Sequence, residues 1–163
     1  MTSNPRDRRS APTMPSLHPE LKDKRVLLVD DDPGVRGSLS DVLVSEGCVV
    51  IPAENGQQAL ALADSAKLDL VILDLNMPVK NGWDTFERLT GRYPLLPVII
   101  ATARPNQLFT ALGAGVGALL EKPMDIATLL HTMEKLLLEP NELRLARVAG
   151  QATEFYYQPR ESP

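Results

Sequence analysis

The sequence predicts an α/β fold in which helices cover both faces of a parallel sheet, a doubly wound three-layer sandwich. Three observations support this. Five short apolar segments alternate with five segments of helical pattern, which is typical of βαβ units. The apolar segments are nearly continuous in Leu, Ile and Val, as in strands buried on both faces. Hydrophobic residues make up 44% of the 163 residues, which is enough for one such core.

The predicted strands begin after a polar N-terminal stretch. Residues 1–22 are rich in Pro, Ser, Arg and Thr and have no apolar period, so we predict a flexible leader. The body of the domain, residues 23–139, holds all five strand patterns. They are Arg25–Val29, Cys48–Ile51, Leu68–Leu75, Val98–Ala101 and Ala118–Leu120.

The predicted helices lie between these strands and follow the last one. In the first of them, Val35, Leu39 and Leu43 recur at helical spacing, and Gly47 stands where the helix ends. Asp125 is suited to cap the last helix at its N-terminus. The five predicted helices are Val35–Ser45, Asn55–Ala66, Trp83–Arg92, Asn106–Leu112 and Asp125–Leu138.

Residues 140–163 form a predicted C-terminal tail that is too short for a second domain. Asn141–Val148 is expected to form one more short helix, which Gly150 ends. Three adjacent aromatic residues follow at Phe155–Tyr157. They are expected to dock a partner, to pack back on the domain, or to have no contact, and the sequence does not decide between these alternatives.

The net charge and the cysteine content argue against some classes of protein function. A formal net charge of -4 argues against binding to nucleic acid by bulk charge. The single cysteine, Cys48, excludes an internal disulfide and fits the reducing cytoplasm. The apolar runs are far shorter than the roughly 20 residues that span a membrane, and no apolar segment follows the basic residues Arg6, Arg8 and Arg9. We therefore expect a cytoplasmic protein without direct contact to nucleic acid or membrane.

Polar residues follow the ends of four predicted strands. Asp30 and Asp31 follow the first strand and Asp74 the third, while Thr102 and Lys122 close the fourth and fifth. A single Asp at such a position usually forms a turn or caps a helix. Because open α/β sheets bind ligands at the carboxyl ends of their strands, we expect all five side chains to converge. Crowded carboxylates favour a hard cation such as Mg²⁺, and an aspartate beside Mg²⁺ and a lysine suits in-line attack on a phosphoryl group.

The same segments resemble response-regulator receiver domains of two-component systems. The resemblance rests on LLVDDDPGVR (27–36), DLVILDLNMPVKNGWD (69–84), PVIIATA (97–103) and LLEKPM (119–124). It covers about residues 23–139 and is to the single-domain, CheY-like type. It implies a flavodoxin-like (βα)5 fold with the parallel sheet order 2-1-3-4-5.

The resemblance also implies a role for each site residue. Asp74 would be the phospho-acceptor, and Lys122 and Thr102 would bind the phosphoryl oxygens. The protein would not be an enzyme, apart from catalysing its own phosphorylation and dephosphorylation. A cis Lys122–Pro123 bond often accompanies this arrangement. The Mg²⁺ cofactor would be held by Asp31, by Asp74, by the backbone carbonyl of Asn76, and by Asp30 through a metal-bound water.

The partners that the resemblance implies are a histidine kinase or phosphotransfer protein as donor and an unidentified protein target. The signal would pass through the face built by the fourth helix, fifth strand and fifth helix, and a homodimer is a further option. In the family's switch, Thr102 is coupled to an aromatic residue at the position of Leu119. The leucine departs from this pattern, and the glycine-rich segment 112–118 predicts a mobile loop before it.

Two alternative functions remain open from the sequence. The first is a receiver-like domain that binds partners constitutively without phosphorylation, which the leucine at position 119 favours. The second is a haloacid-dehalogenase-like phosphohydrolase with Asp30 as nucleophile in a D-x-D pattern. Gly34 stands where that class expects Thr or Val, and no acidic pair follows Lys122, so the sequence disfavours it.

Overall fold

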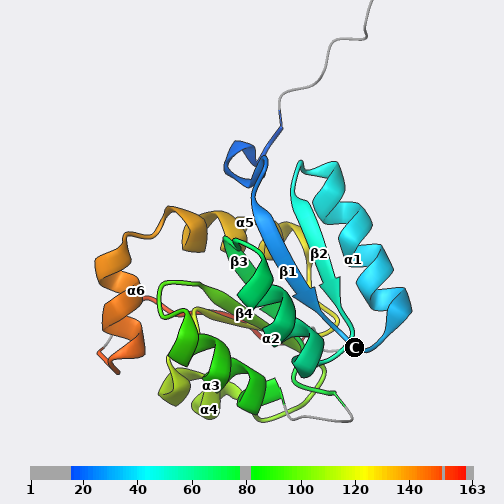
Figure 1. Cartoon of the computed structure of the whole chain (residues 1–163). Coiled ribbons are helices and arrows are strands. Elements are labelled where there is room, and N and C mark those ends of the chain that lie inside the picture. The colour runs from blue at the N-terminus through cyan, green and yellow to red at the C-terminus, as the bar shows by residue number, and fades with distance from the viewer. Residues whose placement is uncertain (1–15, 78–81, 152, 161–163) are drawn as a thin grey trace, which may run out of the picture.

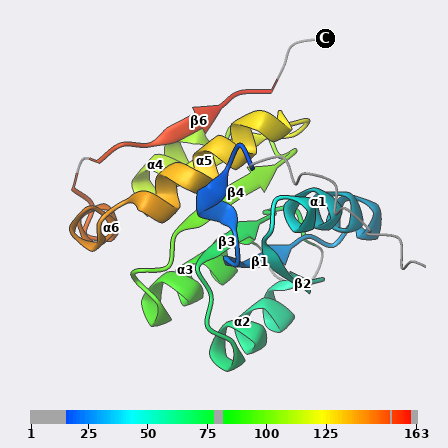
Figure 2. The same ribbon diagram turned by 90° about the horizontal axis from the view of Figure 1, so that it is seen from above.

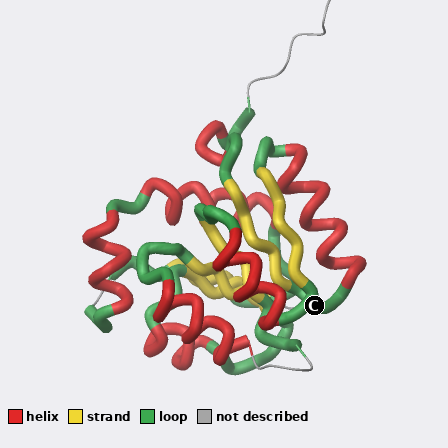
Figure 3. Tube along the Cα trace, viewed as in Figure 1, coloured by secondary structure: helices red, strands yellow, loops and turns green. Residues whose placement is uncertain are grey.

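An open parallel sheet of six strands forms the centre of the molecule (Figures 1 and 3). The computed structural model describes residues 16–77, 82–151 and 153–160. The strand order is β2-β1-β3-β4-β5-β6, and every pairing is parallel. The predicted order 2-1-3-4-5 is confirmed, and a sixth strand extends it. The strands are β1 (Arg25–Val29), β2 (Val49–Ala53), β3 (Leu70–Leu73), β4 (Val98–Thr102), β5 (Ala118–Glu121) and β6 (Tyr156–Gln158).

Capping side chains begin three of the helices. Asp32 accepts hydrogen bonds from the backbone N–H groups of Gly34 and Val35, while Asn55 and Asp125 each accept one from the residue three positions on. Both the capping role of Asp125 and the short helix after residue 140 are as the sequence predicts. The helices are the 3-10 helix η1 (Pro19–Leu21), α1 (Pro33–Ser45), α2 (Gly56–Ser65), α3 (Gly82–Arg92), α4 (Leu108–Ala114), α5 (Ile126–Leu138) and α6 (Asn141–Val148).

Two apolar layers form because successive strand residues point to opposite faces of the sheet. Leu27 and Val29 face one side, where they join apolar residues of α2, α3 and α4. Val26 and Leu28 face the other side, where they meet α1 and α5. Figure 2 shows α2 and α3 on one side of the sheet and α1 and α5 on the other. This is the predicted three-layer sandwich.

The burial of the edge strand β2 differs from the one that its sequence predicts. The apolar run at residues 48–51 predicts burial on both faces, but β2 lies at the end of the sheet and Val49 is exposed. Cys48, just before the strand, is buried, and its thiol donates to the backbone carbonyl of Leu21 at 3.5 Å. Burial, followed by the negative charge of Glu46, raises the pKa of the Cys48 thiol to about 11. Cys48 is therefore a small core residue.

The two ends of the described chain both pack on the sheet layers. Leu21, within the predicted leader, is fully buried among residues of the α1 and α5 side. At the other end, β6 pairs with β5, and Phe155 and Tyr156 pack against opposite faces. Of the alternatives for these aromatics, packing back on the domain is the one observed. The division of the chain at residues 22 and 139 stays a prediction, and residues 1–15 lie outside the described part.

Candidate functional site

Three carboxylates meet at the carboxyl end of the sheet. One oxygen from each of Asp30, Asp31 and Asp74 lies within 4.8 Å of the other two. Asp30 and Asp74 are 2% and 5% exposed, whereas Asp31 is exposed to solvent. The loops after β1 and β3 bring them together because these strands are neighbours in the sheet. The convergence predicted from the strand ends is therefore observed for all three acids.

Lys122 reaches the same cluster from the end of β5. Its Nζ lies 2.6 Å from Asp30 Oδ2 and 3.6 Å from Asp74 Oδ2, and its side chain is only 18% exposed. One ammonium group thus bridges two buried carboxylates. The peptide bond from Lys122 to Pro123 is cis, as the family resemblance implies.

Short loop hydrogen bonds fix the orientation of the two buried acids. Asp74 Oδ1 accepts from the backbone N–H of Asn76, and Asp30 Oδ1 accepts from that of Asp32, both at 3.0 Å. These are turns that an aspartate makes with the backbone two residues on. The guanidinium of Arg36 also donates to the backbone carbonyl of Asp30 at 2.7 Å. Asp32 itself is used as the cap of α1 and is not part of the metal-type cluster.

The surroundings of Asp74 raise its pKa above the ordinary value of a carboxyl. Burial raises the pKa of Asp74, the Asn76 N–H and Lys122 act against this, and the charges of Asp30 and Asp31 raise it further. The net shift is upward, so additional positive charge next to Asp74 would favour its ionised form. A hard divalent cation with oxygen ligands, such as Mg²⁺, fits this donor set.

Thr102 and Leu119 lie deeper in the sheet than the acids. Thr102 is fully buried at the end of β4; its hydroxyl oxygen accepts from the Arg104 N–H at 3.0 Å, and its carbonyl accepts from the Lys122 N–H at 2.8 Å. Leu119 is fully buried on β5 and belongs to the core on the side of α2, α3 and α4. Its neighbours in the sheet are Ile100 and Tyr157. At the family's aromatic position, this chain therefore has an aliphatic core residue.

Two contacts near the site were not predicted from the sequence. Trp83 Nε1 donates to Gln107 Oε1 at 2.9 Å and joins the beginnings of α3 and α4. Arg160 donates from its side chain to the backbone carbonyls of Ala103 and Lys122, which belong to the loops after β4 and β5. Arg160 lies outside the segments that resemble receiver domains, and no sequence pattern marks it.

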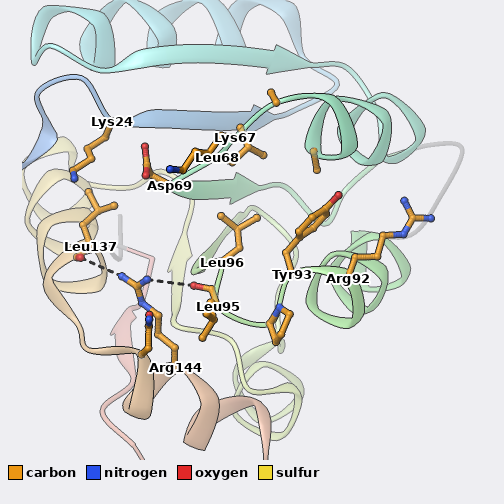
Figure 4. A pocket seen from close by; sticks show the side chains of 14 residues that line it. Lys24, Lys67, Leu68, Asp69, Arg92, Tyr93, Leu95, Leu96, Leu137 and Arg144 are labelled. Atoms are coloured by element: carbon orange, nitrogen blue, oxygen red, sulfur yellow. Dashed lines mark hydrogen bonds between the residues drawn. The ribbon is translucent and has the colours of Figure 1, made fainter.

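Two hollows of similar size lie at opposite ends of the sheet. One, of about 670 Å³, lies beside Lys122 and is lined mainly by apolar residues of α1 and of the loop after β5. The other, of about 620 Å³, lies where the strands begin (Figure 4). There the Arg144 guanidinium donates to the backbone carbonyls of Leu95 and Leu137, so it serves to hold the end of α5. Because α/β sheets bind ligands where strands end, the acidic cluster is the candidate site.

Curated relatives match the body of the chain. Protein PilH of Pseudomonas aeruginosa is 38% identical over 117 residues, which cover 69% of this chain and 97% of PilH. The transcriptional regulatory protein CpxR of Escherichia coli (strain K12) is 41% identical over 115 residues, which cover 69% of this chain and 49% of CpxR. The chain thus spans about half the length of the CpxR relatives that it matches.

Solved structures give the same match at the level of the fold. The response regulator TrrA of Thermotoga maritima, in complex with Mg(2+)-BeF, has a TM-score of 0.65 and 31% identity over 69% of this chain and 98% of that one. Chemotaxis response regulator CheY4 of Vibrio cholerae has a TM-score of 0.64 and 31% identity over 71% and 99%. The fold is therefore the flavodoxin-like fold of CheY-like proteins.

The family assignment rests on the site and on the matched segment together. The acids, Thr102 and Lys122 lie at the strand ends where the resemblance requires them. In the described segments, no helix has both the length and the apolar character needed to cross a membrane. A family model described as the response regulator receiver domain matches residues 26–134. The chain belongs to the receiver domains of two-component response regulators.

Proposed function

We propose that this chain is a phosphorylation-switched signalling module that accepts a phosphoryl group on Asp74 in the presence of Mg²⁺. The observation that carries this proposal is the cluster of three carboxylates with a lysine ammonium 3.6 Å from Asp74. Receiver domains are in general signalling domains and not enzymes. The chemistry that we assign to this chain is limited to its own phosphorylation and dephosphorylation.

The proposed transfer uses the side chains of the site in distinct roles. A carboxylate oxygen of Asp74 attacks the phosphorus of a phosphorylated histidine on the donor, so an O–P bond forms. The N–P bond of the donor breaks, and its electron pair returns to the imidazole nitrogen. Lys122 offsets charge on the phosphoryl oxygens, and the Thr102 hydroxyl donates a hydrogen bond to one of them.

We assign the metal ligands from the same cluster. Asp31, Asp74 and the backbone carbonyl of Asn76 would bind Mg²⁺ directly, and Asp30 would hold a metal-bound water. When bound, the ion supplies positive charge next to the phosphoryl oxygens. The complex of the similar regulator TrrA with Mg(2+)-BeF supports this choice of cofactor.

The proposed partners follow from the family. Receiver domains interact with histidine kinases or phosphotransfer proteins, and one of these would be the donor here. In the cytoplasm, the protein would signal through contacts with another protein, with a homodimer as a further option. The net charge of -4 supports a protein target over direct binding to nucleic acid.

The output surface that we propose adds strand β6 to the face that the resemblance implies. The edge of β5 is paired with β6 along residues 118–120. A partner that uses the face of α4, β5 and α5 therefore meets β6 as part of that face. We include β6 in the proposed output surface.

Tryptophan fluorescence tests the proposed function. Trp83 follows Gly82, whose backbone N–H donates to the Leu75 carbonyl next to Asp74, so its environment is tied to the site. We expect Mg²⁺ with beryllofluoride to change the emission of the native protein. Asp74→Asn should abolish the beryllofluoride response because the acceptor oxygen loses its charge. No response in the native protein, together with no phosphorylation, would contradict the proposal.

A second candidate function is a receiver-like module that binds its partner without phosphorylation. The buried aliphatic Leu119 favours it, because an aromatic switch residue is missing at this position. The two candidates differ in one measurable respect. In a constitutive module, Asp74→Asn and native protein bind the partner with equal affinity in the presence and absence of beryllofluoride.

A further inference from the structure

Arg160, in the C-terminal segment, binds the backbone next to the candidate site. We call residues 155–160 the C-terminal latch. The Nε of Arg160 donates to the Lys122 carbonyl at 2.9 Å, and its Nη2 donates to the Ala103 carbonyl. The backbone N–H of Arg160 donates to Glu121 Oε2 at 2.9 Å. All three acceptors lie within one residue of Thr102 or Lys122.

The two carbonyl acceptors begin the loops after β4 and β5, at or next to the proposed phosphoryl-binding residues. Ala103 directly follows Thr102 after β4, and Lys122 directly follows β5. A guanidinium is planar and presents its N–H donors in a fixed fork, so it holds two carbonyl groups at a defined separation. A lysine in its place would keep the charge without this geometry.

The position of Arg160 is set by the rest of the latch. β6 pairs with β5 in register, and the Tyr157 hydroxyl donates to Glu121 Oε1 at 3.0 Å. The Tyr156 ring lies 5.4 Å from the Lys135 ammonium of α5, and Phe155 packs against the core on the opposite face. Arg160 therefore lies two residues beyond the end of an anchored strand.

We propose that the C-terminal latch positions the phosphoryl site: Arg160 holds the backbone at Ala103 and Lys122 so that Thr102 and Lys122 are preorganised for phosphoryl oxygens. This inference rests on the proposed function. Groups that are ordered before binding lose less conformational entropy when the ligand arrives, so the latch strengthens binding at Asp74. Since coupling between two sites is reciprocal, a phosphoryl group at Asp74 also stabilises the closed latch.

Titration with beryllofluoride in excess Mg²⁺, followed by Trp83 emission, tests the first half of this coupling. We expect Arg160→Ala to weaken the affinity roughly tenfold, which corresponds to about 1.4 kcal/mol. Arg160→Lys should bind beryllofluoride almost as weakly as Arg160→Ala, because lysine keeps the positive charge but lacks the planar guanidinium that donates to both carbonyl groups. Arg92→Ala is the matched control: it removes an exposed arginine that pairs with Asp64 near the hollow at the opposite end of the sheet, and it should leave the affinity unchanged.

Hydrogen exchange tests the reciprocal half. The Tyr156 N–H donates to the Gly117 carbonyl at 3.3 Å, so its exchange reports on the pairing of β6 with β5. Beryllofluoride should slow exchange in residues 156–158 of the native protein, and should have no such effect in Arg160→Ala. Thermal unfolding of each variant establishes that it is folded; Arg160 is exposed, so no loss of the fold is expected.

The outcomes separate this inference from the proposed function. A native protein with no Asp74-dependent response to beryllofluoride contradicts both. A native response together with equal affinity in Arg160→Ala overturns the latch alone, as does full recovery in Arg160→Lys, which would assign the effect to charge.

Discussion

At the scale of single residues, the pKa of Asp74 is set by opposing effects within the site. Burial raises its pKa, and two neighbouring carboxylates add to the effect. A carboxyl whose pKa is higher in the folded than in the unfolded state contributes stability at low pH. That contribution is lost as the pH rises through the folded-state pKa. At neutral pH and without metal, the ionised Asp74 therefore destabilises the fold.

Replacement of this charge by an isosteric amide tests that conclusion. Asp74→Asn keeps an oxygen to accept the Asn76 N–H and removes the charge, so the thermal midpoint in chelator at neutral pH should rise by roughly 2–4 °C. The gain should shrink as the pH falls, because the native Asp74 then becomes protonated. Calorimetry measures both. Asp41→Asn, an exposed site on α1, changes the net charge equally and should leave the midpoint unchanged; an unchanged or lower midpoint in Asp74→Asn would refute the conclusion.

Leu119 is the residue at which the chain departs most from its family. It is fully buried, so the larger ring of Leu119→Phe should overpack the core and destabilise the fold by about 1–3 kcal/mol. Urea denaturation measures this loss. Leu112→Phe at an exposed position of α4 provides the control and should stay within about 0.5 kcal/mol of the native protein. If Leu119→Phe were as stable as the native protein, position 119 would have room for an aromatic switch.

Residue types at strand ends made most of the site predictable. Asp30 and Asp74 each directly follow a buried run and Lys122 follows the last residue of β5, so parallel pairing brings them together. The different roles of the three consecutive aspartates were harder to predict. Asp32 caps α1, whereas Asp30 and Asp31 belong to the carboxylate cluster. Arg160 could not be predicted, because its role exists only after β6 has paired with β5.

At the scale of elements, the central strands were predictable because they are apolar on both faces. β2 was also predicted as a strand, but its apolar run suggested burial on both faces, and the exposure of Val49 follows from the edge position instead. β6 has three residues, too few to show a strand period, and it forms on a β5 edge that would otherwise present unpaired backbone groups. The structure also explains why one position before β5 is a glycine. Gly115 ends α4 with a φ of 77°, and a Cβ there would lie 2.7 Å from the Arg147 carbonyl oxygen.

Helix α3 must begin very close to the backbone of the site. A Cβ on Gly82 would lie 2.6 Å from the Leu75 Cα and 2.7 Å from the Asp74 carbonyl oxygen. Gly82→Ala should therefore displace this loop, destabilise the fold by about 1–3 kcal/mol and weaken beryllofluoride binding. Thermal unfolding and Trp83 emission measure the two effects.

The same helix offers a matched control for this substitution. A Cβ on Gly91 meets open space, so Gly91→Ala should be neutral or stabilise α3 by up to about 1 kcal/mol. Native-like stability and beryllofluoride affinity in Gly82→Ala would contradict the close approach of α3 to Asp74.

At the scale of the whole molecule, the described chain has a segment that matches the receiver family and a C-terminal segment beyond that match. The family model matches residues 26–134, which span β1 to most of α5. Helix α6 and strand β6 lie beyond that match, and Figure 2 shows β6 next to α5 at the border of the sheet. The addition closes one edge of the sheet and reaches the candidate site through Arg160. The fold thus follows the family, while α6 and β6 lie outside the segment that the family model matches.

Covalent labelling with a small phosphodonor in the presence of Mg²⁺ tests the central claim most directly. Intact-mass analysis followed by peptide mapping locates the label. We predict one phosphoryl group per chain, attached to Asp74 and absent in Asp74→Asn. A label on Asp30 would instead indicate the phosphohydrolase type of chemistry, and a native protein that takes no label at all would contradict a phosphorylation-switched receiver.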